Sequence, residues 1–81
     1  MIAIAMATYN GEKYLTEQIN SILEQSYSNW VLFVHDDNSS DNTVSIIRQY
    51  QIDYPEKIIF LDDNISFGNP QDNFSYIITN I

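Results

Sequence analysis

Two unbroken apolar runs, each followed by a helical pattern, constrain the fold of this chain more than any other feature. Residues 2–7 (IAIAMA) and 30–34 (WVLFV) contain no polar residue. A strand with one wet face alternates apolar and polar residues, whereas a continuous apolar run suits a strand buried on both faces of a parallel sheet. Both runs are therefore predicted to be strands of a parallel sheet, and residues 58–61 (IIFL) are predicted to be a third.

Apolar residues recur at helical spacing after each of these runs. They are Leu15, Ile19, Ile22 and Leu23 after the first run, Val44, Ile47, Tyr50 and Tyr54 after the second, and Phe74, Ile77, Ile78 and Ile81 after the third, where Pro70 suits the first turn of a helix. Strands separated by helices form parallel βαβ units with right-handed crossovers. The predicted fold class is α/β, a βαβαβα half of a doubly wound, Rossmann-like parallel sheet with strand order 3-2-1.

The length of 81 residues allows one small domain. The third helical pattern is still running at Ile81, with no Gly, Lys or Arg to end it. We therefore expect residues 1–81 to be part of one domain that has been truncated.

The charge balance excludes one large class of partners. The net charge is −8, and the basic residues are Lys13, Arg48 and Lys57, which are scattered. Nucleic-acid binding needs clustered basic residues, so no nucleic-acid partner is expected. The chain has no cysteine, no basic start typical of a secretory signal, and no apolar run of about 18 residues. These features predict a cytoplasmic protein.

Polar residues follow each predicted strand, at what would be one edge of the sheet. Ligands of such sheets bind at the carboxyl ends of the strands. Asp36 and Asp37 could accept hydrogen bonds from a ribose or a base there, or could cap the helix that follows. Because residues 39–41 (SSD) already offer caps, we favour the ligand-binding interpretation.

The other polar residues at these strand ends give weaker signals. A single histidine at the end of a buried strand, such as His35, is more often a hydrogen-bonded structural residue than a base. Asp62 and Asp63 could contact a ribose, but solvated loop charges are the favoured interpretation. The turn after the first strand, residues 8–12 (TYNGE), is not a GxGxxG loop, so a nicotinamide dinucleotide is disfavoured and Tyr9 is free to lie flat against a ring.

Three motifs occur in an order and spacing that identify a family. The first strand ends in MATYNG (residues 6–11) followed by EKYL, the first helix carries QINSILEQSY (18–27), and the second strand is followed by DDNSSDNT (36–43). This combination closely resembles the start of family 2 glycosyltransferases, which have the GT-A fold. The resemblance covers nearly the whole chain.

The resemblance implies a nucleotide-binding role for the strand ends. Tyr9 would stack on or flank the base, and the backbone of Ala7 and Thr8 would contact the nucleotide. Asp37 would accept a hydrogen bond from a ring N–H, and Asp36 would support Asp37 or contact the ribose. Residues 1–81 would then be the N-terminal nucleotide-sugar-binding part of a single GT-A domain.

The whole enzyme, by the same resemblance, transfers a sugar from a UDP-, GDP- or dTDP-sugar to a glycan or lipid-linked acceptor. Bacterial cell-surface polysaccharide synthesis is the implied setting, in the cytoplasm or at the inner face of the membrane. The family's divalent metal (Mn or Mg) is bound by acids beyond residue 81, and the catalytic base lies further still. We therefore expect no catalytic or metal-binding residue in this chain, and no sugar transfer by residues 1–81 alone.

The sequence departs from the family pattern at a few positions. Ala7 replaces a common proline, His35 an aliphatic residue, and Asn38 a frequent glycine. Residues 62–73 lack the basic residue that the family often places near the phosphates, so contact of this segment with pyrophosphate is not expected.

Two alternatives from other classes stay open. A receiver-like signalling domain has a similar sheet, but its acid pair follows the first strand, where this chain has residues 8–10 (TYN). A non-catalytic binding module could keep the glycosyltransferase-like shell. In the resembling family a further strand pairs beside the first one. Truncation would leave residues 2–7 as an open apolar edge without charge or proline, so we expect self-association or pairing with the missing remainder of the domain.

Overall fold

The structure is a computed structural model that describes residues 1–63 and 65–81. Three strands form one parallel sheet, β1 (Ile2–Thr8), β2 (Trp30–Asp36) and β3 (Ile58–Phe60). The helices are α1 (Glu12–Glu24), α2 (Thr43–Asp53) and α3 (Pro70–Asn80). β2 is central, with β1 and β3 paired on either side of it, which confirms the predicted α/β class and the strand order 3-2-1.

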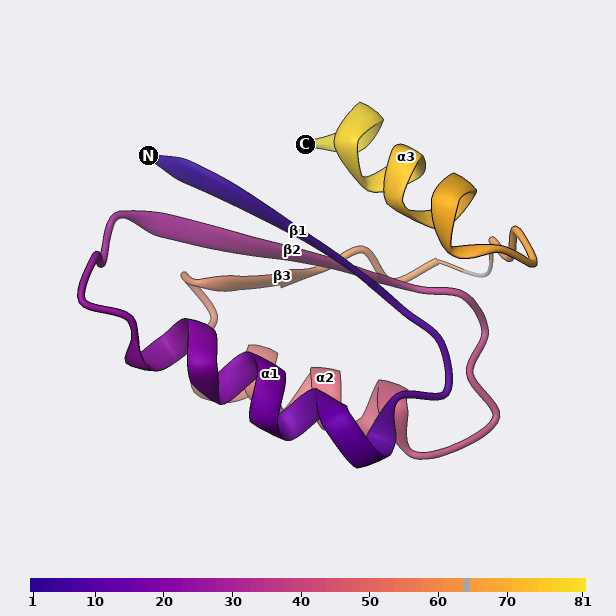
Figure 1. The fold of residues 1–81 in the computed structure, drawn as a ribbon, viewed down its shortest axis with the longest axis horizontal. Helices are drawn as coiled ribbons and strands as arrows, with labels where there is room; N and C mark the ends of the chain where they lie inside the picture. Colours follow the sequence, from indigo (N-terminus) through magenta and orange to yellow (C-terminus); the bar gives the residue numbers. More distant parts are fainter. Residues whose placement is uncertain (64) are drawn as a thin grey trace.

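The helices form two layers around the sheet (Figure 1). α1 and α2, which connect consecutive parallel strands, lie together on one face, and α3 crosses the other face. Right-handed crossovers place both connecting helices on the same side of a sheet whose strands follow one another in order. In the described residues, no helix has both the length and the apolar character needed to span a membrane.

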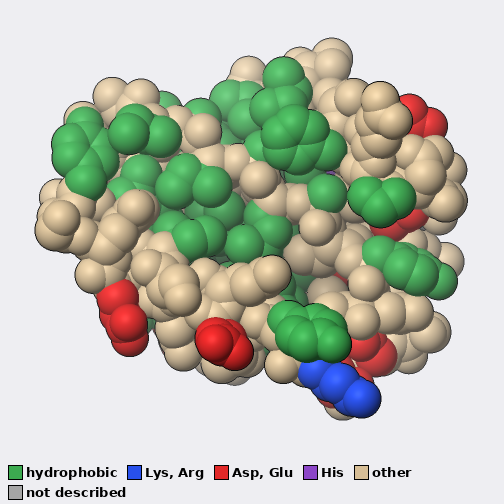
Figure 2. Space-filling model, viewed as in Figure 1, with side chains coloured by type: hydrophobic (Ala, Val, Ile, Leu, Met, Phe, Trp, Pro, Cys, Tyr) green, Lys and Arg blue, Asp and Glu red, His purple; other side chains and the backbone are tan. Residues whose placement is uncertain are grey.

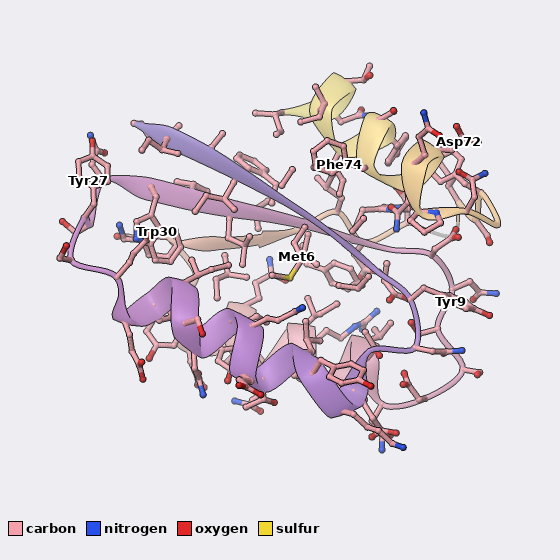
Figure 3. All side chains as sticks on the ribbon, in the orientation of Figure 1. Met6, Tyr9, Tyr27, Trp30, Asp72 and Phe74 are labelled. Atoms are coloured by element: carbon pink, nitrogen blue, oxygen red, sulfur yellow. The ribbon has the colours of Figure 1, made fainter. Side chains whose placement is uncertain are left out.

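The main core lies between the sheet and the α1–α2 layer. Its members are buried apolar side chains from α1, α2, β2 and β3: Leu15, Ile19, Trp30, Leu32, Val34, Ile47 and Ile58. Alternate residues of a strand point to the same face, and accordingly Leu32 and Val34 of β2 are both fully buried on this side. Met6 extends from β1 toward the same layer (Figure 3) and packs against this cluster.

The opposite face is covered less completely. Ile77 of α3 is fully buried, but Phe74 and Ile78 of the same helix are 46% and 53% exposed, and Ile2 of β1 is 51% exposed. Figure 2 shows hydrophobic side chains gathered over β1 and beside α3. We call this surface, made of Ile2, Phe74, Ile78 and Ile81, the apolar α3 face.

Candidate functional site: a cavity at the carboxyl ends of the strands

The carboxyl ends of β1 and β2 lie side by side. Thr8 pairs with Asp36 in the parallel register, and the backbone N–H of Asp37 donates to the carbonyl of Thr8 at 2.9 Å. A cavity of about 470 Å³ opens beside these ends, a size typical of small-molecule sites. It is lined by Ala7, Thr8, Tyr9, Asp37, Asn38, Ser66, Gly68, Asn69, Pro70 and Asn73.

Four of the five site residues predicted from the sequence line this cavity. Ala7 and Thr8 form the end of β1, Tyr9 follows them, and Asp37 lies across from them after β2. The Tyr9 side chain is 61% exposed at this edge of the molecule (Figure 3), so its ring faces are available for stacking. Asp36 does not line the cavity.

The Asp37 carboxylate binds the segment that follows β3. It is 5% exposed, and its two oxygens accept hydrogen bonds from the backbone N–H groups of Phe67 (2.5 Å) and Gly68 (3.0 Å). Gly68 has φ +79°, in the left-handed region that favours glycine. An ionised carboxylate has about four lone-pair positions, so Asp37 can accept further hydrogen bonds from a ligand.

Asp36 joins the end of β1 to the loop after β2. Its carboxylate accepts hydrogen bonds from the Thr8 hydroxyl (2.7 Å), the Ser39 hydroxyl (2.6 Å) and the Ser39 backbone N–H (2.7 Å). Neither Asp36 nor Asp37 caps α2, because the N–H of Thr43 donates to Asp41 at 3.0 Å. The helix-capping interpretation of this acid pair is therefore wrong.

The loops after β1 and β2 are also bonded directly to each other. The Asn10 backbone N–H donates to the Ser39 hydroxyl at 2.8 Å, and the Asn10 side-chain oxygen accepts from the Ser40 N–H at 2.8 Å. Asn10 and Asn38 have φ values of 47° and 61°, a conformation that asparagine tolerates better than most residues. The two sides of the cavity mouth thus hold each other in place.

Asp41 completes this junction at the start of α1. It accepts a hydrogen bond from the Thr43 hydroxyl, which lowers the pKa of the Asp41 carboxyl, and it also accepts from the N–H of Glu12 at 3.2 Å. The N–H of Gly11 donates in turn to the Thr43 hydroxyl at 2.9 Å. Gly11 is the N-cap residue of α1, and its carbonyl accepts hydrogen bonds from the N–H groups of Tyr14 and Leu15.

His35 and Asp63 meet on the α3 side of the sheet. His35 is fully buried, and its ring nitrogens lie 2.5 Å from the Asn73 oxygen and 2.7 Å from an Asp63 oxygen, which confirms the hydrogen-bonded structural interpretation. The favoured interpretation of Asp63 as a solvated loop charge is wrong, because it is held by His35 and by the Tyr76 hydroxyl at 2.7 Å. That interpretation fits Asp62, an exposed carboxylate that pairs with exposed Arg48 at 3.1 Å.

Hydrogen bonds shift the pKa values of this group in opposite directions. Partial burial acts to raise the pKa of Asp63, but hydrogen bonds from Tyr76 and His35 outweigh it and leave that pKa below its ordinary value. The same hydrogen bond to Asp63 raises the pKa of Tyr76. Both shifts favour the carboxylate accepting and the phenol donating.

The sequence analysis missed the part of the cavity wall that comes from the end of the chain. Ser66, Gly68, Asn69 and Pro70 line the cavity from the segment before α3, and Asn73 lines it from the first turn of that helix. One signal was available for Asn73, which lies four residues before Ile77 on the inner side of the helix, at a position where an apolar residue is expected.

Within residues 1–63 and 65–81, no cluster of three or more His, Asp or Glu side chains is arranged to hold a metal ion.

Fold and cavity together define the class: a Rossmann-like α/β unit with its ligand cavity at the carboxyl ends of parallel strands. Comparison with known families makes this specific, because the model of glycosyl transferase family 2 matches residues 3–71. The chain belongs to glycosyl transferase family 2, as the motifs at residues 6–11, 18–27 and 36–43 predicted.

Several curated relatives are similar to the chain over much of its length. The chain is 41% identical over 76 residues to the dTDP-rhamnosyl transferase RfbG of Shigella flexneri. This alignment covers 94% of the chain and 26% of RfbG. It is 49% identical over 43 residues to the UDP-Glc:alpha-D-GlcNAc-diphosphoundecaprenol beta-1,3-glucosyltransferase WfgD of Escherichia coli. This alignment covers 53% of the chain and 17% of WfgD. A poly(ribitol-phosphate) beta-N-acetylglucosaminyltransferase, TarS of Staphylococcus aureus, is 34% identical to the chain over 64 residues. This alignment covers 76% of the chain and 11% of TarS. The chain thus spans about a quarter or less of these proteins.

Proposed function

We propose that this chain is the nucleotide-sugar-binding part of a bacterial glycosyltransferase that builds a cell-surface polysaccharide. Family membership supports the reaction class, transfer of a sugar from a nucleotide-sugar donor to a glycan or lipid-linked acceptor. The observation that carries the proposal is the cavity at the ends of β1 and β2, with exposed Tyr9 on one side and buried Asp37 on the other.

The proposed roles follow from the chemistry of the lining residues. Tyr9 presents a largely exposed aromatic ring, on which a base can stack. Asp37 offers a charged acceptor for a ring N–H, and the backbone of Ala7 and Thr8 offers polar groups for the rest of the nucleotide. Asp36 has the supporting role, since its three hydrogen bonds hold Thr8 and Ser39 around the cavity.

The donor is proposed by chemical class. The names of RfbG and WfgD specify a dTDP-sugar and a UDP-sugar respectively. Uracil and thymine both carry a ring N–H, which can donate a hydrogen bond to the Asp37 carboxylate. UDP and dTDP are therefore the first nucleotides to test, with GDP as the third, and the WfgD name makes a lipid-linked glycan a reasonable acceptor class.

We propose that the whole enzyme uses a divalent metal, because members of this family are generally metal-dependent. Such an ion would neutralise the donor diphosphate. We propose, on the resemblance to the family, that the ligands for Mn or Mg, and the catalytic base, come from sequence beyond residue 81. The site of action that we propose is the cytoplasm, or the inner face of the membrane.

The alternative functions are weaker. A receiver-like domain has no support in the family match or in the relatives, which are glycosyltransferases. A non-catalytic glycosyltransferase-like module would share the nucleotide cavity. An assay of sugar transfer by the whole protein distinguishes it from an active glycosyltransferase, because the module would transfer no sugar.

The test of the cavity is a calorimetric titration of the chain with UDP, dTDP and GDP. Replacing Asp37 by alanine is expected to weaken binding by about 1–3 kcal/mol, the cost of leaving a buried donor unpaired. Asp37→Asn keeps an acceptor oxygen but loses the charge, so it is expected to lie between wild type and Asp37→Ala. Asp53→Ala, at an exposed position at the end of α2, is the matched control and should bind as wild type does. Equal affinity of Asp37→Ala and wild type would contradict the proposed role of Asp37.

The apolar α3 face supports a second, structural proposal. Its exposed side chains come from both β1 and α3, and the aligned segments make up only 26% of RfbG and 17% of WfgD. We propose that in the whole enzyme the remainder of the GT-A domain covers this face, and that residues 1–81 alone cover it by self-association.

A further inference from the structure

The cavity wall is connected to one buried side chain that contributes no atom to the cavity itself. His35, the penultimate residue of β2, points to the α3 side and is fully buried. Its ring contacts Asn73 of α3 through Nδ1 and Asp63 of the segment after β3 through Nε2. These two partners belong to the two parts of the chain that close the cavity.

The orientation of Asn73 fixes the role of Nδ1. The Asn73 amide nitrogen donates to the backbone carbonyls of Thr8 (3.4 Å) and His35 (3.2 Å). The amide oxygen therefore faces the ring, and Nδ1 must carry a proton to hydrogen-bond to it. Asn73 is 1% exposed, and it joins β1, β2 and α3 at one point of the cavity wall.

The surroundings of Asp63 fix the role of Nε2. The Asp63 carboxylate accepts hydrogen bonds from the Tyr76 hydroxyl (2.7 Å) and from the backbone N–H of Ile65 (3.1 Å). An ionised carboxylate can only accept, so Nε2 must also carry a proton to hydrogen-bond to Asp63. A neutral imidazole has one N–H. The contacts of Nδ1 with Asn73 and of Nε2 with Asp63 can therefore both be hydrogen bonds only when the ring is an imidazolium.

The segment beside the cavity is held from two sides. The rings of Phe67 and Tyr76 pack near the His35 ring, with centroids 5.9 Å and 4.8 Å away. The Phe67 and Gly68 N–H groups donate to Asp37 on the other side. His35 therefore anchors the side of the segment that faces the sheet, and Asp37 anchors the side that faces the cavity.

We propose that His35 is a positioning residue of the cavity, whose imidazolium holds Asn73 and the segment 65–69 against the carboxyl ends of β1 and β2. The identity of the ligand rests on the proposed function, but the ordering of the wall does not. The proposal predicts that removing either His35 donor loosens the wall, and with it the hydrogen bonds from Phe67 and Gly68 to Asp37.

The titratable groups in contact with the ring are Asp63 and Tyr76. Burial acts to raise the pKa of Asp63, but hydrogen bonds from Tyr76 and His35 outweigh it and lower that pKa. The hydrogen bond to Asp63 raises the pKa of Tyr76. Both shifts favour an ionised Asp63 carboxylate, which accepts hydrogen bonds from the His35 ring and from the Tyr76 hydroxyl.

Amide hydrogen exchange measured by NMR tests the proposal without any ligand. In His35→Leu the protection factors of the Phe67 and Gly68 amides are expected to fall about tenfold, because two hydrogen bonds are lost. The amides of Leu32 and Val34, in the α1–α2 core, serve as the internal reference. Asp63→Ala should lower the same two protection factors, whereas the matched control Asp62→Ala should leave them unchanged, since Asp62 pairs with exposed Arg48.

Rescue by a conservative variant separates positioning from general stability. His35→Gln keeps donor groups and is expected to recover part of the protection lost in His35→Leu. Unchanged protection in His35→Leu, or a fall shared equally by the Leu32 and Val34 amides, would overturn the proposal.

Titration of the same variants with UDP, dTDP and GDP then links the wall to the ligand. His35→Leu is expected to weaken the binding of whichever nucleotide binds wild type, by about three- to tenfold. If wild type binds none of the three, the proposed function fails, and the exchange data alone still decide the role of His35. If wild type binds and His35→Leu binds equally well with its wall loosened, the positioning role is refuted.

Discussion

The two faces of the sheet are closed in different ways. Under α1 and α2 the contacts are apolar, and Leu15, Ile19, Leu32 and Ile47 are at most 1% exposed. Under α3 only Ile77 is buried to that extent among the apolar side chains of the helix, while Asn73 makes polar contacts at its first turn. One face is a packed core, and the other combines an apolar region that is half exposed with a polar junction beside the cavity.

The difference reflects what each helix has to cover. α1 and α2 are crossover helices whose apolar stripes meet the same side of three strands, so together they exclude water from it. α3 is a single helix over β1 and β2, and it leaves part of both uncovered. Its first turn meets the strand ends, where the carbonyls of Thr8 and His35 need donors, and Asn73 supplies them.

The largest expected effect tests the packed face. Ile19→Ala should lower the free energy of unfolding by about 2–5 kcal/mol, because a fully buried side chain is truncated in a rigid environment. Ile77→Ala should cost less, since its partly open surroundings can relax, and exposed Ile78→Ala should change stability by less than about 0.5 kcal/mol. Urea unfolding measures all three. Equal losses for Ile19→Ala and Ile77→Ala would remove the distinction between the faces.

The next effect concerns the apolar α3 face. Light scattering at tens of micromolar should show dimers or larger species of residues 1–81, and more of them at higher salt, because salt screens the net charge of −8. Ile78→Lys should weaken this association about tenfold, since it removes an exposed apolar side chain from the contact. Ile52→Lys is the matched control, because Ile52 is 72% exposed on α2, outside this face. A stable wild-type monomer would contradict the prediction.

A smaller effect, the loss of stability in acid, distinguishes the polar junction around Asp63 and His35 from the apolar core. The pKa of Asp63 is lower in the folded chain than its ordinary value of 3.8, so the unfolded chain binds the proton more tightly. The stabilisation by Asp63 is therefore fully present above about pH 4 and is lost as pH falls below it. Denaturant midpoints measured across this range should fall less in Asp63→Asn than in wild type. Asp62→Asn is the control, and a fall in Asp63→Asn as large as in wild type would refute the assignment.

The smallest effect is expected at the surface ion pair. Arg48 donates to both oxygens of Asp62 at 3.1 Å, but both side chains are more than half exposed. Exposed pairs contribute little, so Arg48→Ala should lower the free energy of unfolding by less than about 1 kcal/mol. A double-mutant cycle with Asp62→Ala measures the pair itself. A coupling above that limit would show that this edge of the molecule is more rigid than its exposure indicates.

The sequence was sufficient for the elements and their order. Continuous apolar runs and helical stripes predicted three parallel strands and three helices. The strand ends differ from the prediction by one residue at Thr8 and Phe60, and by two residues at Asp36. These features depend on local periodicity and on general rules of chain connection. The same rules placed the ligand site at the carboxyl ends of the strands, and the family resemblance named the four residues that line the cavity, Ala7, Thr8, Tyr9 and Asp37.

Contacts between distant segments could not be predicted. Asp63 was expected to be solvated, but it meets His35 and Tyr76, which lie 28 residues before it and 13 residues after it. The N–H groups of Gly11 and Glu12 at the start of α1 donate to side chains of Thr43 and Asp41, which lie 32 and 29 residues further along the chain. Polar side chains carry no periodic signal, and their partners are set only when the sheet has formed.

The hydrogen bonds between Asn10 and Ser39 and Ser40 have a consequence for the thermodynamics of ligand binding. Loops that are ordered only in the bound state lose conformational entropy on binding, which weakens affinity. Here the loop that carries Tyr9 and the loop that follows Asp37 restrict each other before any ligand arrives. Most of that entropy is lost when the chain folds, so we expect the base to meet a preorganised mouth. Asn10→Ala removes the hydrogen bond from the Ser40 N–H and leaves the backbone bond to Ser39. We expect this loss to make the entropy of binding the proposed nucleotide less favourable.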